Sequence, residues 1–259
     1  LQIAGACLAL GLPAAVYAMA TWLIAQAAMV SPLLGQLVSI GLVYTTLAGR
    51  DLFDHVQAVS RELRQGNLAG AREAVARIVG RDSATLTEPE VVRATVETIA
   101  ESTADGIIAP LVYLSLGGAP LALAYKAVNT LDSMVGHRDE RYEHFGWASA
   151  RLDDVMNWVP ARLTGGFIAL ASGLATAEWH RVHDSWSILD RDGGKHPSPN
   201  SGIPEAAMAG ALGVQLGGLN YYDGVAHDGE LIGDANPALT IGHVKQATRI
   251  LVVAAGLGL

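Results

Sequence analysis

The chain has 259 residues, of which 51% are hydrophobic and 16% are charged, and its mean hydropathy is +0.30. This composition is too apolar for an ordinary water-soluble domain and favours a protein of the lipid bilayer. The formal net charge of −8 argues against a nucleic-acid partner, because binding to a phosphate backbone needs clustered Lys and Arg. The single cysteine, Cys7, excludes an intrachain disulfide and a metal site built from several cysteines.

The N-terminal region is uncharged, since the first charged residue is Arg50. Its length predicts two membrane helices, over about 3–24 and about 33–49. Pro13 is expected to bend or interrupt the first, and Ser31-Pro32 marks the turn between them. A buried core of a soluble protein is the alternative. The chain starts on Leu1 with no basic residue, so we expect no cleaved signal and further residues upstream.

A charged segment follows, with Arg and Glu among apolar residues at helical spacing. It predicts three helices, within 50–67 with a stop at Gly66-Asn67, within 68–82 with a stop at Gly80, and over 86–102. Thr87 is expected to begin the third, with Pro89 in its first turn. Because Arg50, Arg61 and Arg64 come directly after the second span, we expect this segment on the cytoplasmic side.

The rest of the chain alternates between apolar and polar stretches. Residues 106–125 are apolar, but Pro110 and the sequence GGAP at 117–120 break them, as in a re-entrant or discontinuous helix or in a kinked span. Apolar runs return at 155–175 and from about Ile250, separated by Gly-rich polar loop and a short helix. We therefore predict an all-α, polytopic membrane protein with a cytoplasmic helical segment and polar motif loops, forming one functional domain from segments 1–49, 50–105, 106–176 and 177–259.

Three carboxylates recur every fourth residue in the third soluble helix, at Glu97, Glu101 and Asp105, with Arg93 one turn earlier. Like charges at this spacing repel each other unless a cation neutralises them. The pattern is typical of a Mg²⁺-binding or general-base face, although a solvated acidic stripe has the same spacing.

Asp154, Asn157 and Arg162 lie roughly on one side of a helix that leads into the apolar run. An arginine facing lipid at the bilayer centre costs about 2.5–3.5 kcal/mol, so Arg162 is expected to face a partner or a wet cavity. Snorkelling to the membrane interface is the alternative.

Further along the chain, Ser198, Asn200 and Ser201 precede a helix of small residues that carries Glu205 in its first turn. Free N–H groups there can hold an anion, or the polar residues simply cap the helix. No G-x-x-x-x-G-K-[ST] sequence occurs, so any nucleotide site is not a Walker loop.

Four stretches resemble the CobD/CbiB cobalamin biosynthesis proteins, the membrane-bound adenosylcobinamide-phosphate synthases. They are VGRD (79–82), VETIAESTADGIIAPL (96–111), YKAVNTLDSMVGHRDERYEHFGWASARLDDVMNWVPARLT (125–164) and SPNSGIPEAAMAGALGVQLGG (198–218). Two departures stand out. Ser102 occupies the place of the Asn expected in E-N-x-x-D-G, and the H-P-V-like motif expected ahead of the first span is not in this sequence.

The resemblance implies ATP-dependent amide ligation. A propionate of adenosylcobyric acid, the corrinoid substrate, would be joined to (R)-1-amino-2-propanol or its O-phosphate, giving adenosylcobinamide or its phosphate. ATP would first convert the unreactive carboxylate into an acyl phosphate, which the amine would then attack. Such a site needs Mg²⁺ ligands, cations for the phosphates and a base for the amine.

This chemistry assigns catalytic roles, as metal ligands or bases, to six acidic residues in the stretches that carry the resemblance: Glu97, Glu101, Asp105, Asp132, Asp153 and Asp154. Mg²⁺ is expected at five of them, Glu97, Glu101, Asp132, Asp153 or Asp154. The cations assigned to phosphate or propionate are Lys126, which we count among the catalytic residues, Arg138, Arg141 and Arg162. The residues expected to line the pocket are Asn129, Asn157, Ser198, Asn200 and Glu205.

We expect a multi-pass protein of the cytoplasmic membrane with its site facing the cytoplasm. If every apolar run crossed the membrane, residues 50–105 and 126–153 would lie on opposite sides and the site would be split. We therefore predict that residues 106–125 re-enter rather than cross. The alternatives are a transporter with discontinuous helices and a catalytically silent relative that acts as a sensor or scaffold.

Overall fold

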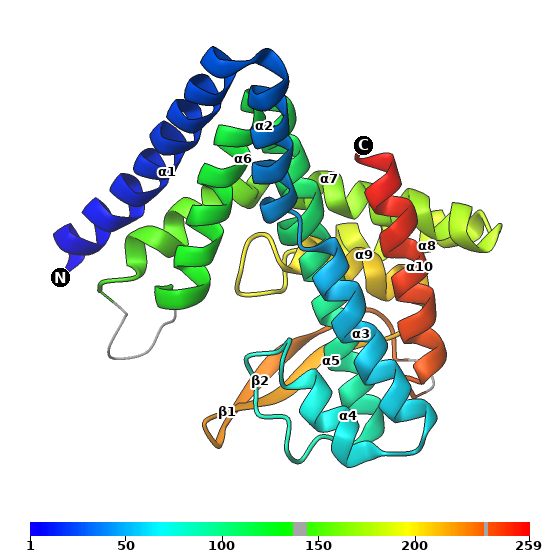
Figure 1. Ribbon diagram of the computed structural model, residues 1–259. Helices are drawn as coiled ribbons and strands as arrows, with labels where there is room; N and C mark the ends of the chain where they lie inside the picture. The colour runs from blue at the N-terminus through cyan, green and yellow to red at the C-terminus, as the bar shows by residue number, and fades with distance from the viewer. Residues whose placement is uncertain (137–143, 236–237) are drawn as a thin grey trace. The chain divides into compact units, whose positions relative to one another are not determined.

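The computed structural model describes residues 1–136, 144–235 and 238–259. It divides into two compact units (Figure 1). Unit 1 comprises Leu1–Ala48 and Asp105–Pro160, and unit 2 comprises Gly49–Ala104 and Ala161–Leu259.

Unit 1 is built from long apolar helices. They are α1 (Gln2–Val30), α2 (Pro32–Thr46), α6 (Ala109–Val135) and the part of α7 (Trp147–Thr176) that precedes residue 161. Helix α1 packs against α2 and α6, and α2 also packs against α6. The turn at Ser31-Pro32 is confirmed, since the Ser31 hydroxyl accepts a hydrogen bond from the Leu34 amide at 3.1 Å and caps α2. The prediction that Pro13 interrupts the first helix is wrong, because α1 is continuous through Pro13 and extends to Val30.

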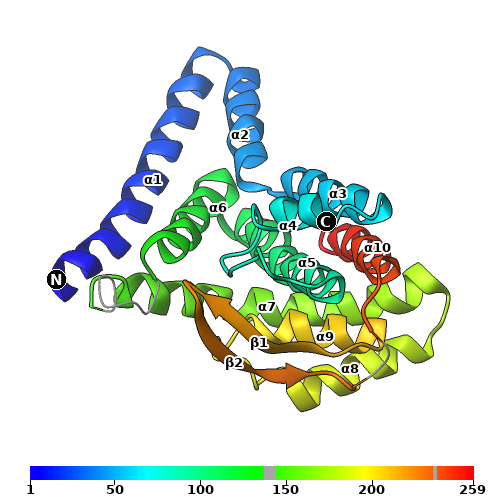
Figure 2. The ribbon, with the colours of Figure 1, turned by 90° about the horizontal axis from the view of Figure 1, so that it is seen from below.

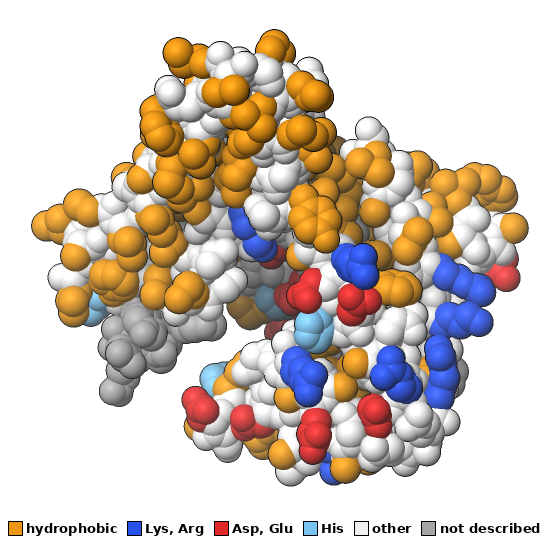
Figure 3. Space-filling model, viewed as in Figure 1, with side chains coloured by type: hydrophobic (Ala, Val, Ile, Leu, Met, Phe, Trp, Pro, Cys, Tyr) orange, Lys and Arg blue, Asp and Glu red, His pale blue; other side chains and the backbone are white. Residues whose placement is uncertain are grey.

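Many apolar side chains of α1 and α2 are exposed, among them Ile3, Trp22, Leu33 and Leu37. They cover the surface of these helices in Figure 3. Three segments, Gln2–Val30, Pro32–Arg64 and Glu88–Val135, are long and apolar enough to cross a membrane. Exposed apolar surface of this extent suits lipid rather than water, so the chain is a membrane protein.

Helix α6 contains the break that the GGAP sequence predicts. Gly117 and Gly118 leave helical geometry, and Gly118 takes φ 68° and ψ −167°, a conformation essentially restricted to glycine. Pro120 follows directly and has no N–H to continue the helix. The break is confirmed, whereas re-entry of residues 106–125 stays a prediction.

Unit 2 is centred on α5 (Glu88–Thr103), which packs against α3 (Gly49–Arg64), α4 (Leu68–Val75), α9 (Gly202–Leu212) and α10 (Ile241–Leu257). Figure 2 shows α5 among these helices, with α8 (His180–Asp192) beside α9. The predicted start of α5 is confirmed. Thr87 and Glu90 form a capping box in which the Thr87 amide donates to the Glu90 carboxylate at 2.7 Å.

Two predicted boundaries are wrong. Helix α4 ends at Val75 rather than at Gly80, because the chain tightens into turns in which the amides of Arg77 and Ile78 donate to the carbonyls three residues earlier. Helix α10 begins at Ile241 rather than near Ile250, since Thr240 and His243 form a capping box ahead of the apolar run.

The region predicted as polar loop contains a β-hairpin. Strands β1 (Leu216–Tyr222) and β2 (Val225–Ile232) pair antiparallel, with Tyr222 opposite Val225 at the turn. The two turn residues, Asp223 and Gly224, have φ of 50° and 76°, the positive values of a type I′ turn. The all-α class holds for the described residues, with this hairpin as an addition.

Gly233, the residue after β2, is joined to α8 through Asp192. Its buried carboxylate forms ion pairs with Arg191 at 2.7 Å and Lys195 at 2.8 Å, and accepts a hydrogen bond from the Gly233 amide at 2.8 Å. The hydrogen bond from Arg191, reinforced by Lys195 and the Gly233 amide, holds the pKa of Asp192 well below its usual range. A carboxyl group with a lowered pKa stabilises the fold above its unfolded pKa, and this stability is lost as the pH falls.

We therefore expect Asp192→Ala to lower the free energy of unfolding by about 1–3 kcal/mol at pH 7, since it leaves the Gly233 amide without its acceptor. The difference from the wild type should shrink as the pH falls below about 4, where the unfolded carboxyl becomes protonated. Thermal unfolding in detergent measures both effects. Asp190→Ala, an exposed position of the same helix, is the matched control, and equal losses in the two variants would contradict this role.

Candidate functional site

A polar cavity of about 470 Å³ lies in unit 2. Its walls come from the segment before α5, from α5 itself, from the segment before α9, from α9 and from both strands of the hairpin. The side chains that give it chemical character are Arg81, Glu97, Glu101, His196 and Glu205. Three of the four motif stretches therefore contribute to one cavity, although they are far apart in the sequence.

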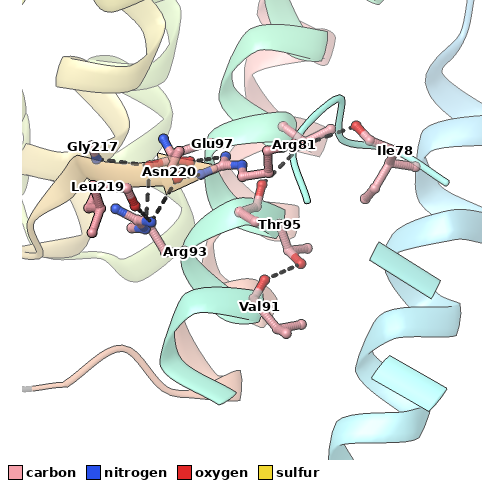
Figure 4. Close-up of polar contacts among 11 residues, drawn as sticks. Ile78, Arg81, Val91, Arg93, Thr95, Glu97, Gly217, Leu219 and Asn220 are labelled. Atoms are coloured by element: carbon pink, nitrogen blue, oxygen red, sulfur yellow. Dashed lines mark hydrogen bonds and ion pairs between the residues drawn. The ribbon is translucent and has the colours of Figure 1, made fainter. Parts of the chain in front are cut away.

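Glu97 ties α5 to the hairpin (Figure 4). One carboxylate oxygen, Oε1, accepts a hydrogen bond from the Gly217 amide at 2.8 Å, and the other, Oε2, pairs with the Arg81 guanidinium. Arg93, one turn earlier on α5, places Nε 4.0 Å from Oε1. Gly217 has φ of 76°, and a Cβ there would collide with the Glu230 carbonyl. Glu97 is thus a buried charge with two cationic neighbours and a backbone donor.

The same arginines hold Asn220 of strand β1. Arg81 and Arg93 both donate to its side-chain oxygen, the latter at 2.9 Å, and Arg93 also donates to the Leu219 carbonyl at 2.9 Å. At the hairpin turn, the Gly224 amide donates to Asp82 at 2.8 Å. The hairpin wall of the cavity is therefore fixed to α5 and to the segment before it by charged hydrogen bonds.

A second carboxylate pair lies in the cavity. Glu101 of α5 and Glu205 of α9 share a hydrogen bond, and Ser201 also hydrogen-bonds to Glu101. Ligand atoms of Glu101, Glu205 and His196 all lie within 4.8 Å of one another. Burial, together with the negative charges of Glu101 and Glu97, raises the pKa of Glu205 well above its usual range. Two hydrogen-bonded carboxyl groups need a proton or a cation between them.

A separate polar cluster is buried in unit 1. Asn129 of α6 places its amide nitrogen 3.5 Å from both Asp105 and Asp153, and Asn157 donates to Asp153 at 2.8 Å. The Tyr125 hydroxyl donates to Asn157 at 2.8 Å. Asn129, Asp153 and Asn157 are all buried, which is costly unless their polar groups are satisfied. This cluster joins the π-helical turn at Ala104–Ile108 to α6 and α7.

The expected site residues thus fall into two groups. Glu97, Glu101 and Glu205 lie in the unit 2 cavity, whereas Asp105, Lys126, Asn129, Asp153 and Asn157 belong to the unit 1 cluster, where Lys126 donates to Asn129 at 3.1 Å. The three evenly spaced carboxylates of the sequence are divided between the units, because α5 ends at Thr103 and a π-helical turn begins at Ala104.

The remaining expected residues have other partners. Arg162 donates to Asn200 at 3.4 Å within unit 2, which agrees with the expectation that it faces a partner. The Ser198 hydroxyl accepts from the amides of Asn200 and Ser201 at 3.3 Å, so it stabilises the turn before α9. Asp154 lies 3.7 Å from Arg151. Asp132 is half-buried near the end of α6, and Arg138 and Arg141 lie outside the described residues.

Three residues of the cavity, Arg81, His196 and Asn220, were not predicted from the sequence. Arg81 lies in the VGRD motif, which carried the family resemblance without a role for its arginine. His196 is separated from the S-P-N-S-G motif by Pro197 alone, and this closeness to the motif was the available signal. Asn220 reaches the cavity only because β1 pairs with β2, which no local pattern around it shows.

The fold and these clusters define a helical membrane protein with buried carboxylate sites. The family model described as CobD/Cbib protein matches residues 1–251. The chain is 54% identical to the cobalamin biosynthesis protein CobD of Geobacter metallireducens over 89% of this chain and 72% of that protein. It is 45% identical to CobD of Citrobacter koseri and to CbiB of Salmonella typhimurium, over 100% of this chain and 80% of each relative. No solved structure matches it. The chain belongs to the CobD/CbiB family.

Replacing Glu97 tests how the cavity wall is held. Glu97→Gln keeps the shape but removes the negative charge between Arg81 and Arg93, so the hairpin should open more often. We expect about tenfold faster hydrogen exchange of amides within residues 216–232 than in the wild type, measured by mass spectrometry in detergent.

Glu88→Gln is the control, because Glu88 is exposed at the start of the same helix. Unchanged protection of the hairpin in Glu97→Gln would show that Glu97 does not hold it.

Proposed function

We propose that this chain acts in cobalamin biosynthesis as an ATP-dependent amide ligase. The substrates would be adenosylcobyric acid and (R)-1-amino-2-propanol or its O-phosphate. One observation carries the proposal: in a chain related over its length to cobalamin biosynthesis proteins, the motif carboxylates Glu97, Asp153 and Glu205 are buried in two polar clusters instead of lying on a solvated surface. Burial of so many charges costs stability, and functional sites commonly accept that cost.

The reaction requires two bond exchanges. The propionate oxygen attacks the γ-phosphorus of ATP and ADP leaves. The amine nitrogen then attacks the activated carbonyl, phosphate leaves, and nitrogen loses a proton to a base. The protein must therefore supply Mg²⁺ ligands and a binding site for the amine.

The unit 1 cluster has the donor set that Mg²⁺ prefers. Asp105 and Asp153 present carboxylate oxygens to the same amide of Asn129, and the charge of Asp132 also acts on Asp153. Mg²⁺ takes hard oxygen ligands, so these aspartates would hold it, and the bound ion would shield the phosphate charges of ATP. Lys126 lies beside them on α6 and would bind a phosphate oxygen.

Glu97, by contrast, is a poor choice as a Mg²⁺ ligand. Its oxygens are already engaged by the Gly217 amide and the Arg81 guanidinium. We assign it the role of positioning the cavity wall. Asp154 lies near Arg151 and is more exposed than Asp153, so we place it at the edge of the unit 1 cluster.

The test is an activity assay on membranes that carry the full-length protein. Adenosylcobyric acid, Mg²⁺-ATP and aminopropanol phosphate are supplied, and mass spectrometry follows the corrinoid. The proposal predicts a mass gain of one amide linkage that depends strictly on ATP. A corrinoid that binds but gains no mass would favour a silent relative, and ATP-independent flux of the corrinoid across the membrane would favour a transporter.

Within the same assay, Asp153→Asn should raise the Mg²⁺ concentration for half-maximal activity by about tenfold or more, because it removes one charged ligand. Asp184→Asn, at an exposed position of α8, is the control and should keep the wild-type Mg²⁺ dependence. An unaltered Mg²⁺ dependence in Asp153→Asn would exclude the unit 1 cluster as the metal site.

We also propose that the protein lies in the cytoplasmic membrane with its site towards the cytoplasm. Cys7 is the single cysteine of the sequence and is exposed, so Cys7→Ser gives a clean background for labelling. In that background, Ala84→Cys and Glu140→Cys should react with a membrane-impermeant maleimide from the cytoplasmic side only. Labelling from opposite sides would mean that residues 106–125 cross the bilayer.

A further inference from the structure

Glu101 and Glu205 differ from Glu97 in having no ion-pair partner among the described residues. Glu97 is paired with Arg81 and lies near Arg93. Among the residues that the structure describes, no Lys or Arg lies within ion-pair distance of Glu101 or Glu205. The cavity therefore contains one carboxylate with an ion-pair partner and a neighbouring pair that has none, although the charge of Arg81 also acts on both members of the pair. The pair faces a space of about 470 Å³, enough for a small organic molecule.

His196 does not add a positive charge beside this pair. The Ser198 amide donates to its Nδ1 at 3.0 Å, so the proton of the neutral ring is on Nε2. Burial lowers the pKa of His196, which keeps the ring neutral near pH 7.

This tautomer also affects which kind of cation Glu101 and Glu205 can bind. A histidine ligates a metal through a nitrogen lone pair, and in His196 the Nδ1 lone pair accepts a hydrogen bond while Nε2 carries the proton. A metal ion bound by Glu101, Glu205 and His196 would have to replace either the hydrogen bond at Nδ1 or the proton at Nε2. An organic cation that donates N–H groups to the carboxylates leaves both intact.

We propose that Glu101 and Glu205 form the subsite for the primary ammonium group of the amine substrate. This inference rests on the proposed function and gives its amine a place. A primary ammonium carries one positive charge and three N–H donors, which match two adjacent carboxyl groups. Thr98 and the backbone around Gly217 and Gly218 line the same cavity, which leaves room for the short alkyl chain.

Binding of the amine alone tests the subsite. The full-length protein in detergent is titrated with 1-amino-2-propanol by calorimetry, without ATP or corrinoid. We expect Glu205→Gln and Glu101→Gln each to weaken binding by about tenfold or more, because a charge-assisted hydrogen bond is lost. Propane-1,2-diol, in which a hydroxyl replaces the ammonium, should not bind measurably to the wild type.

Glu88→Gln is the matched control, since Glu88 is exposed at the start of α5, does not line the cavity and should leave amine binding unchanged. Thermal unfolding of each variant shows whether it is folded. Wild-type affinity in folded Glu101→Gln or Glu205→Gln would overturn the proposal, as would a loss of amine binding in Asp153→Asn alone.

A metal site is the remaining rival. If Mn²⁺ binds the wild type, is lost in Glu205→Gln and is not displaced by the amine, the pair is a metal site and the proposal is wrong. The subsite and the proposed function can be rejected independently. Amine binding that depends on Glu205 without any ATP-dependent mass gain would support the subsite and reject the ligase. Ligation by the wild type together with unaltered amine binding in both variants would support the ligase and reject the subsite.

Discussion

The buried charge of Glu97 is the interaction on which the unit 2 cavity depends. Its carboxylate receives the Arg81 guanidinium and the Gly217 amide, and Arg93 lies one turn away on the same helix. A buried ion pair is not a general source of stability, because desolvation offsets much of the attraction. It does fix geometry, since each partner left alone would be a costly buried charge. Through this pairing, a residue of α5 determines where a hairpin 120 positions later begins.

The two units use burial of polar groups in different ways. In unit 1, amide side chains of Asn129 and Asn157 separate the carboxylates, so that each aspartate has a neutral donor. In unit 2, Glu97 has cationic partners, and Glu101 and Glu205 contact each other directly. The first arrangement suits a hard metal ion held by oxygen atoms, and the second suits a cation that brings its own hydrogen-bond donors. Both assignments follow from the donors present, and neither depends on the other.

Much of the fold could be predicted from local sequence, because its signals are local. The capping box at Thr87, the turn at Ser31-Pro32 and the break at Gly117-Gly118 each arise from a few neighbouring residues. The hairpin was missed although Asp223-Gly224 is a favourable type I′ turn sequence. Gly217 and Gly218 weaken the strand pattern of β1, and β2 is exposed along most of its length, so neither strand shows clean alternation.

The residue types of the site could be predicted from the sequence, but which of these residues lie together could not. Spacing placed Glu97, Glu101 and Asp105 on one helical line, but the π-helical turn and the division into units give them different neighbours. The contact of Glu101 with Glu205 and the role of Arg81 depend on tertiary packing between segments far apart in the sequence, which periodicity does not show.

Isotope transfer tests most directly the proposed ligation, in which ATP activates a carboxylate for attack by an amine. The full-length protein is given adenosylcobyric acid labelled with ¹⁸O in the reacting propionate, together with Mg²⁺-ATP and the amine. The account predicts that inorganic phosphate released with the amide carries one ¹⁸O atom from the propionate. Amide formed with unlabelled phosphate would contradict activation through a carboxylate–phosphate bond.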